Sequence, residues 1–485
     1  MSFVSITYGV FLIAGMIVYY CIPKKGQWIW LLLLGMLFYF ISSPMGSILL
    51  CFSLASSFWF GRVCDKGRNA SPASGARNKC LLILILFANI GILLLCKTFI
   101  KMPLIPERIR AGLGIFVPLG ISFYTLTIIA YMVDVYRGKI RAERNFFRYM
   151  LFVSFFPQII QGPIPRYDEL RDQLMAEHRF DYKQMIYAFE LIVWGLFQKM
   201  VIADNAAIIV NRVFGEYANY GGLYVVLAAF LYSIQLYTDF SGCVCIAKGS
   251  AELFGIRLSD NFRHPYFSHS VKEFWGRWHI SLSRFLKDYI YIPLGGNRKG
   301  KGRKYINLLL TFLVSGIWHG SGLSFLFWGF LHGIYEIAED ALKPLGERIH
   351  AGLSIRTDVF SYRLFTQIRT FVLVAFAWIF FRADSLRVGL LMCRSIFSDF
   401  RLHVLFDESF YLLGLNGREF RMLFVSIAVL WLVGFLQERM QIRESLYRQN
   451  TLFRFCVLLG GMFAILVFGV YGPGYDAAQF IYGNF

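Results

Sequence analysis

The sequence predicts an all-α polytopic membrane protein, and its composition and the length of its apolar runs are the main reasons. Of the 485 residues, 57% are hydrophobic, 18% are aromatic and only 16% are charged. A typical soluble protein carries about 25% charged and about 45–50% apolar residues. A soluble chain of this length would split into about two or three domains with polar linkers. Apolar runs instead recur along the whole chain, so we expect one membrane domain over residues 1–485.

Apolar runs near the length that crosses a bilayer, about 20 residues, predict about 11–12 transmembrane helices, some of them short or tilted. The first run lacks a basic start and a small-residue cleavage site, so we expect it to remain as a span. The predicted spans are residues 3–22, 27–43, 46–61, 80–99, 113–135, 184–204, 220–240, 305–319, 322–339, 367–382, 421–437 and 454–472.

The formal net charge of +19 raises the question of a nucleic-acid partner. With both termini outside, most of the 49 Lys and Arg residues fall in cytoplasmic loops and at span ends, which is the usual orientation signal. The positive charge therefore predicts topology and a lipid bilayer as partner, not nucleic acid. Lys97, Lys101, Arg108 and Arg110 fall on the outer side, which makes the fourth and fifth spans the weakest assignments.

Motifs of several enzyme classes are missing from the sequence. The nine cysteines form no Cys/His cluster with zinc spacing, so neither a metal site nor structural disulfides are expected. No Gly-x-Ser-x-Gly, His-Glu-x-x-His or kinase signature is present. These absences disfavour hydrolase and metalloprotease functions.

Three segments break the apolar pattern. Residues 149–165 are apolar but short and rich in proline, which predicts a re-entrant or interfacial segment buried in protein. Residues 241–304 alternate aromatic and basic side chains, which predicts short interfacial helices on the cytoplasmic side. The third break, at 315–322, contains Ser-Gly-Ile-Trp-His-Gly-Ser-Gly.

His319 lies in the third break and is the strongest candidate for catalysis. The roughly 15 residues from Lys304 to His319 make about 22 Å of helix, short of the roughly 30 Å hydrocarbon core. An ionisable side chain at membrane depth is by default a functional hypothesis, and a neutral imidazole can accept a proton from a hydroxyl. The structural alternative is a histidine that only bonds a neighbouring helix.

Other polar residues have weaker signals. His279, in the basic stretch, is easily solvated, which favours a structural role, and His332 reads as a packed or pore-lining residue. Asp239, one helical turn after Gln235, is either a cap at the inner interface or a group facing a cavity. Residues 295–304 combine glycines with Arg298 and Lys299, which suits the phosphates of a cytoplasmic donor or a plain positive-inside loop.

Several motifs, in order along nearly the whole chain, resemble the membrane-bound O-acyltransferase family, and within it the bacterial branch that contains the alginate O-acetylation protein and the D-alanyl transfer protein of teichoic acids. The extreme C-terminus, Gly483-Asn484-Phe485, departs from the family's more aromatic ending and leaves the subgroup open. The matching segments are Val117-Pro-Leu-Gly-Ile-Ser-Phe-Tyr124, Gln161-Gly-Pro-Ile164, Tyr237-Thr-Asp-Phe-Ser-Gly242, the run from Trp275-Gly-Arg-Trp-His279 to Gly296-Asn297, Ser315-Gly-Ile-Trp-His319-Gly320, Phe380-Phe-Arg-Ala383 and Phe480-Ile-Tyr482.

The resemblance implies a ring of tilted helices around a central funnel in a bacterial inner membrane. Carried over by motif, His319 resembles the family's catalytic histidine and His279 the second family histidine, which makes both catalytic candidates. The expected residues for binding donor or substrate are Asp239, Trp275, Arg277, Trp278, Ser281, Asn297, Arg298, Lys299 and Trp318.

The function implied is transfer of an acetyl group from cytoplasmic acetyl-CoA, or another acyl thioester, to hydroxyls of an extracytoplasmic polysaccharide. The donor acts as a substrate and no bound cofactor is expected. A separate extracytoplasmic O-acetyltransferase is an expected partner. Three alternatives remain: D-alanyl transfer to teichoic acid, a transporter or flippase of a glycan or lipid-linked precursor, and a scaffold without catalysis.

Overall fold

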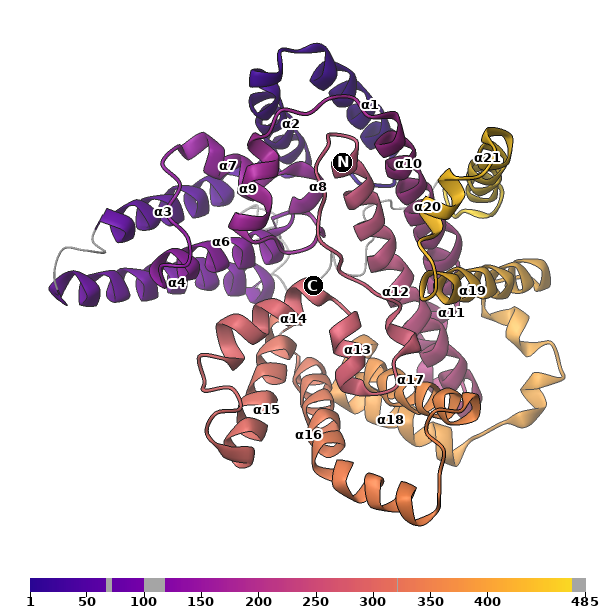
Figure 1. The fold of residues 1–485 in the computed structure, drawn as a ribbon. Helices are drawn as coiled ribbons and strands as arrows, with labels where there is room; N and C mark the ends of the chain where they lie inside the picture. Colours follow the sequence, from indigo (N-terminus) through magenta and orange to yellow (C-terminus); the bar gives the residue numbers. More distant parts are fainter. Residues whose placement is uncertain (67–71, 100–117, 321, 473–485) are drawn as a thin grey trace. The chain divides into compact units, whose positions relative to one another are not determined.

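The computed structural model describes residues 1–66, 72–99, 118–320 and 322–472, and all regular secondary structure in these ranges is helical (Figure 1). The predictions that concern residues 101–117 and 480–485 lie outside this part of the chain. The helices form two compact units, one of residues 1–194 and 243–259 and the other of residues 195–242 and 260–472. The single domain over residues 1–485 stays a prediction.

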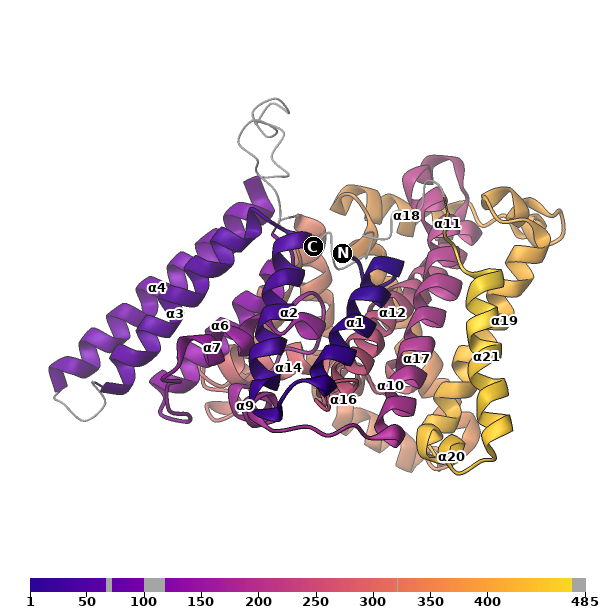
Figure 2. The same ribbon diagram turned by 90° about the horizontal axis from the view of Figure 1, so that it is seen from above.

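The first unit combines long apolar helices with three short helices, α7, α8 and α9. The helices α3 and α4 run side by side as a pair (Figures 1 and 2). Close packing of α2 depends on Gly35, where a Cβ atom would lie 2.7 Å from the carbonyl oxygen of Ser154. The helices are α1 (Ile6–Cys21), α2 (Gln27–Ser42), α3 (Gly46–Lys66), α4 (Pro72–Phe99), α6 (Ile121–Tyr136), α7 (Phe146–Ser154), α8 (Phe156–Ile159), α9 (Tyr167–Met175) and α10 (Tyr182–Leu196).

Residues 149–165 form the end of α7, all of α8 and an irregular tail, and almost every residue in them is buried. The side chain of Asn145 starts α7 by accepting hydrogen bonds from the backbone N–H groups of Phe147 and Arg148. Pro157 stands in the first turn of α8, where a missing N–H is tolerated. The segment is therefore buried in protein, and its re-entrant or interfacial placement stays a prediction.

The second unit contains the remaining helices. It begins with a π-helical turn, η2 (Phe197–Ala203), and includes the part of α12 up to Gly242. The other helices are α11 (Asp204–Gly215), α12 (Gly222–Glu252), α13 (Val271–Arg277), α14 (Ile280–Leu286), α15 (Gly300–His319), α16 (Leu323–Gly352), α17 (Phe360–Arg382), α18 (Leu386–Ser398), α19 (Gly417–Gln437), α20 (Ile442–Tyr447) and α21 (Thr451–Phe468).

Within the described residues, eight helical segments are long and apolar enough to cross a membrane, and Ile6–Cys21 and Ile121–Tyr136 are shorter apolar helices. Each predicted span overlaps a helix of the structure. The chain is therefore an all-α, multi-pass membrane protein.

The predicted end of a span at residue 240 is wrong, because α12 continues as one helix of 31 residues to Glu252. Buried side chains recur at spacings of three and four residues through the predicted break, which keeps one apolar face on the helix. These side chains belong to Phe240, Cys243, Val244, Ala247 and Ala251. After residue 260 the short helices that the sequence predicts are present as α13 and α14.

The predicted break at His319 is confirmed. His319 is the last residue of α15, and α16 begins at Leu323. The two helices lie side by side (Figure 1). A Cβ atom on Gly316 would collide with the carbonyl oxygen of Phe325, and one on Gly329 would collide with that of Phe312. Glycine at both positions therefore lets the two backbones approach closely.

Candidate active site

His319 is buried at the end of α15, with 2% of its surface exposed. Its imidazole ring packs edge-on against Trp328, at 5.2 Å between ring centroids, and against Phe381, at 5.1 Å. Trp328 comes from α16 and Phe381 from α17, so three helices position this ring. The histidine thus lies at a helix end, as the sequence predicts, and its surroundings are aromatic.

His279 is held by an asparagine that the sequence analysis missed. Asn261 Oδ1 accepts hydrogen bonds from the backbone N–H of Ser281 at 3.1 Å, from its hydroxyl at 2.8 Å and from His279 Nδ1 at 3.2 Å. A backbone N–H can only donate, so the Asn261 atom must be the carbonyl oxygen, and His279 Nδ1 must carry a proton. The other ring nitrogen, Nε2, is then the basic one.

The backbone and the surroundings also constrain His279. It has φ of 45°, in the left-handed region, and stands at the N-terminus of α14. Its ring packs on Phe240 at 4.8 Å between centroids. Burial lowers the pKa of His279 to about 3, so the imidazole is neutral at physiological pH.

The rings of both histidines lie near the same indole, that of Trp318. The centroid of the Trp318 ring is 4.7 Å from that of His319 and 6.3 Å from that of His279. Four residues that the sequence named as candidates, His319, His279, Ser281 and Trp318, are therefore brought together by α14 and α15. A pair of imidazoles in such a setting can hold and transfer a proton.

An aromatic cluster extends from His319 into the unit; it consists of Trp275, Trp328, His332, Trp378 and Phe381 together with His319. Trp275 Nε1–H donates to His332 Nδ1 at 3.2 Å. The rings of Trp328 and Trp378 stack at 5.6 Å between centroids with an angle of 17°. Trp275 therefore belongs to the cluster through its hydrogen bond to His332. The amino-acid sequence does not reveal this contact.

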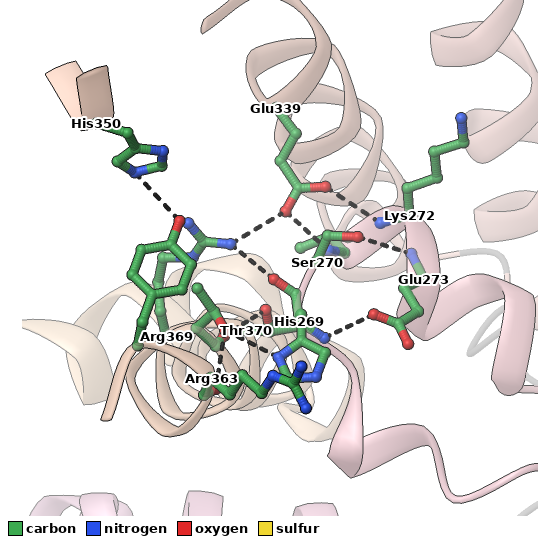
Figure 3. Close-up of polar contacts among 12 residues, drawn as sticks. His269, Ser270, Lys272, Glu273, Glu339, His350, Arg363, Arg369 and Thr370 are labelled. Carbon is green, nitrogen blue, oxygen red and sulfur yellow. Dashed lines mark hydrogen bonds and ion pairs between the residues drawn. The ribbon is translucent and has the colours of Figure 1, made fainter. Parts of the chain in front are cut away.

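A network of charged side chains fixes α13, which carries Trp275 (Figure 3). Glu339 of α16 accepts hydrogen bonds from the backbone N–H groups of Val271 at 2.8 Å and Lys272 at 3.2 Å. Arg369 of α17 donates to the carbonyl oxygen of His269 at 2.8 Å and lies 3.9 Å from Glu339. Glu339 thus caps the N-terminus of α13 from another helix, where a negative charge is favourable.

Arg277 is the last residue of α13 and Trp278 follows it, and the two have different surroundings. Trp278 is buried and stacks on Phe274 at 5.4 Å between ring centroids. The Arg277 guanidinium forms ion pairs with Glu273, at 2.9 Å, and with Glu438 of α19. Both residues hold α13 in place in this structure, and their predicted contact with donor or substrate stays a prediction.

The segment after α14 presents its charges at the surface. Asn297, Arg298 and Lys299 are exposed. The turn before them is fixed by Asn307, whose Nδ2 donates to the carbonyl oxygen of Gly296 at 2.9 Å. This exposed basic loop is suited to attract an anionic molecule, and the structure does not bring it into the ring contacts around His319.

Asp239 is neither a helix cap nor a surface group, because α12 continues past it. Its carboxylate lies 2.7 Å from Lys199 Nζ, which is also 2.7 Å from Asp204. The exposed fraction of the side chain is 2% for Asp239, 3% for Lys199 and 12% for Asp204. Lys199 lies in the π-helical turn η2, an irregularity common at functional sites. Of the two interpretations that the sequence leaves open, the cap is wrong, and Asp239 belongs instead to an ion triad with Lys199 and Asp204.

Of the two residues that the sequence analysis missed, only Lys199 had a signal in the sequence. Lys199 is a lysine inside a predicted span, and such residues almost always pair inside the protein. The burial of Asn261, which is 1% exposed, is a property of the tertiary structure. The signal at Lys199 does not identify its partner, since that depends on how the helices pack.

Much of this sequence is shared with known proteins. Residues 114–381 match the profile of the membrane-bound O-acyltransferase family. The chain is 35% identical over 394 residues to a protein named "Probable alginate O-acetylase AlgI" of Pseudomonas syringae pv. tomato, covering 79% of this chain and 72% of that protein. It is 34% identical over 392 residues to the "Peptidoglycan O-acetyltransferase" of Helicobacter pylori, covering 75% of this chain and 72% of that protein.

A more distant relative carries a different acyl group in its name. The chain is 27% identical over 234 residues to the "Teichoic acid D-alanyltransferase" of Bacillus subtilis, which covers 44% of this chain and 57% of that protein. Similarity is therefore greater, in both identity and coverage, to the two relatives named for O-acetylation.

Proposed function

Because the chain belongs to the membrane-bound O-acyltransferase family, and so is a multi-pass membrane O-acyltransferase, we propose that it transfers acetyl groups to hydroxyls of an extracytoplasmic polysaccharide, with His319 as the general base. The proposal is carried by one observation. His319 ends α15 inside an aromatic environment and shares the Trp318 indole with a second, neutral histidine, His279.

In the proposed reaction, His319 moves one proton from the acceptor hydroxyl to the leaving thiolate. A His319 ring nitrogen takes the proton from the acceptor hydroxyl while the hydroxyl oxygen forms a bond to the carbonyl carbon of the acyl thioester. The resulting tetrahedral intermediate collapses with cleavage of the C–S bond, and the proton passes from His319 to the leaving thiolate. The products are an ester and a free thiol, and His319 returns to its neutral form. A positioned general base contributes about 10²–10⁴-fold to such a rate.

His279 has a supporting role in this proposal. Asn261 accepts a hydrogen bond from its Nδ1–H, so Nε2 is the ring nitrogen that can accept a hydrogen bond. Such a donor is present on the amide-containing arm of acetyl-CoA and on the acceptor hydroxyl. We assign His279 to orientation of one of these substrates rather than to proton transfer in the first step.

The donor in this proposal is a thioester such as acetyl-CoA, used as a substrate. Its phosphates carry negative charge, and the exposed Arg298 and Lys299 provide a positive surface that attracts them. With the topology that the sequence predicts, this loop faces the cytoplasm of a bacterial cell, on the inner side of its inner membrane. The attraction should weaken as ionic strength rises.

The acceptor is proposed from the two O-acetylating relatives, whose names specify alginate and peptidoglycan. D-alanyl transfer is the weaker candidate because the relative named for it is less similar and covers less of the chain. Transfer goes either directly to the polysaccharide or through a separate extracytoplasmic O-acetyltransferase. Both routes use the same attack on the thioester.

The test is an assay on the purified full chain in liposomes with radiolabelled acetyl-CoA and alginate oligosaccharides. His319→Ala should lower cleavage of the thioester at least 10²-fold, whereas His403→Ala, at an exposed histidine, is the matched control and should leave it unchanged. Near-normal acetyl transfer by correctly folded His319→Ala would refute the assignment of the base. Passage of intact labelled solute across the membrane without thioester cleavage would instead support a transporter.

A further inference from the structure

The aromatic cluster contains a histidine whose protonation state is fixed by its neighbour. His332 Nδ1 accepts the hydrogen bond from Trp275 Nε1–H, at 3.2 Å. In a neutral imidazole only one nitrogen carries the proton, so the proton is on Nε2. This Nε2–H group has no hydrogen-bond partner in the described part of the chain, and the side chain is 0% exposed.

Two indoles next to His332 have the same property. The Nε1–H groups of Trp328 and Trp378 also lack a partner among the described residues, and both side chains are 0% exposed. The three rings contact one another: the centroid of His332 lies 5.2 Å from that of Trp328 and 5.9 Å from that of Trp378. Three unpartnered N–H donors are therefore gathered within one cluster.

One of the three donors lies directly beside His319. Trp328 packs directly on the His319 ring, at 5.2 Å between centroids and nearly perpendicular to it. Buried N–H groups in folded proteins are nearly always paired, and each exception calls for an explanation. N–H donors without a partner favour a ligand atom that accepts hydrogen bonds and donates none. The carbonyl oxygen of an acyl group is such an atom.

We propose that the indole N–H groups of Trp328 and Trp378, together with His332 Nε2–H, bind the carbonyl oxygen of the acyl group that is transferred. This inference rests on the proposed function, in which His319 is the base. As the acceptor oxygen attacks, the π electrons of the carbonyl group move onto the carbonyl oxygen. The negative charge on the carbonyl oxygen strengthens the hydrogen bonds from the three donors. No proton is transferred to the carbonyl oxygen, and the C=O double bond forms again when the C–S bond breaks.

The remainder of the cluster is built to keep these donors rigid. Trp328 and Trp378 are stacked, His332 is fixed by Trp275, and Trp275 lies on α13, which Glu339 caps. Donors that are already oriented do not have to reorganise when charge develops, which is the physical basis of oxyanion stabilisation. Because the rings exclude water, the hydrogen bonds act in a medium of low dielectric constant.

The sharpest test replaces the N–H group and leaves the ring. Benzothienylalanine at position 328 or 378 keeps a bicyclic ring of the same shape, with sulfur in place of N–H; Trp328→Phe and Trp378→Phe are simpler variants. Loss of one oxyanion donor lowers kcat about 10²–10³-fold in enzymes with such sites. We expect this loss in thioester cleavage of acetyl-CoA by the full chain in liposomes, with KM changed far less.

Trp30→Phe is the matched control, because the Trp30 N–H already donates to the carbonyl oxygen of Gly15 at 2.9 Å and its loss should leave kcat unchanged. If both benzothienylalanine variants keep kcat within about twofold of the unmodified protein, the donors bind only ordered water and the inference is overturned. A rise in KM alone also overturns it. Full activity of His319→Ala would refute the proposed function separately, since that variant leaves all three donors in place.

Discussion

Lys199 should be more important for stability than either of its two carboxylate partners. It is the single cation of a buried triad, and its Nζ lies 2.7 Å from both Asp239 and Asp204. Replacement by Met removes the cation and leaves two carboxylates facing each other in a buried region. Replacement of Asp239 by Asn leaves Lys199 still paired with Asp204.

The size of the effect follows from these pairings. Removal of one partner of a buried ion pair costs about 3–5 kcal/mol, because the remaining charge is uncompensated. We expect Lys199→Met to reach the upper end, about 5 kcal/mol, and Asp239→Asn to stay near or below about 3 kcal/mol. A triple variant without any of the three charges should recover most of the loss, since neutral replacement of a complete buried pair is often close to neutral in stability.

The measurement is unfolding of the detergent-solubilised protein, followed with a dye that fluoresces on reaction with thiols. The dye reports the exposure of three cysteines that are buried in the folded chain, Cys64, Cys243 and Cys393. Stability should fall in the order wild type, Asp239→Asn, Lys199→Met, with the triple variant above Lys199→Met. The reasoning would be refuted by a Lys199→Met protein as stable as wild type, or by a triple variant no more stable than Lys199→Met.

Three further predictions concern other contacts. Burial alone would raise the pKa of Glu143, but hydrogen bonds from Tyr167 and two backbone N–H groups hold this pKa below its usual value. The stabilisation that results is present above about pH 4.5 and should be lost as the pH falls below that value. Thermal unfolding scans at a series of pH values measure this loss. Glu339→Ala should remove two hydrogen bonds at the N-terminus of α13, while Ser270 still accepts from Glu273 N–H, and should cost about 1 kcal/mol of stability, with a smaller loss for Glu339→Gln. Asn261→Leu should lower kcat by freeing the ring of His279, measured as acetyl-CoA cleavage.

Each of these has an outcome that contradicts it. Glu143→Gln should flatten the acid side of the stability profile, so an unchanged slope below pH 4.5 would exclude Glu143 as its source. For the cap, equal stability of the Ala variant and the wild type would contradict the role of Glu339; Glu347→Ala, at an exposed position on the same helix, is the control. Normal kcat with Asn261→Leu would mean that the asparagine only stabilises the loop.

The sequence predicted the positions of the helices well because the signal for them is local. An apolar run of sufficient length is a property of consecutive residues, and each predicted span overlaps a helix. The break after His319 was equally local, since glycines follow it directly. The error at residue 240 has the opposite origin: polar and charged residues near it look like a helix end, but the buried face of α12 continues to Ala251.

The sequence by itself determined that this chain is a multi-pass helical membrane protein and that His319 and His279 are its candidate catalytic residues. Only the tertiary structure decided the partners of the polar groups. Asn261 meets His279 across 18 residues, Lys199 meets Asp239 across 40, and Trp275 meets His332 across 57. Such pairs depend on which helix faces pack together. That packing is set by apolar surfaces and glycine contacts across several helices, and no local pattern encodes it.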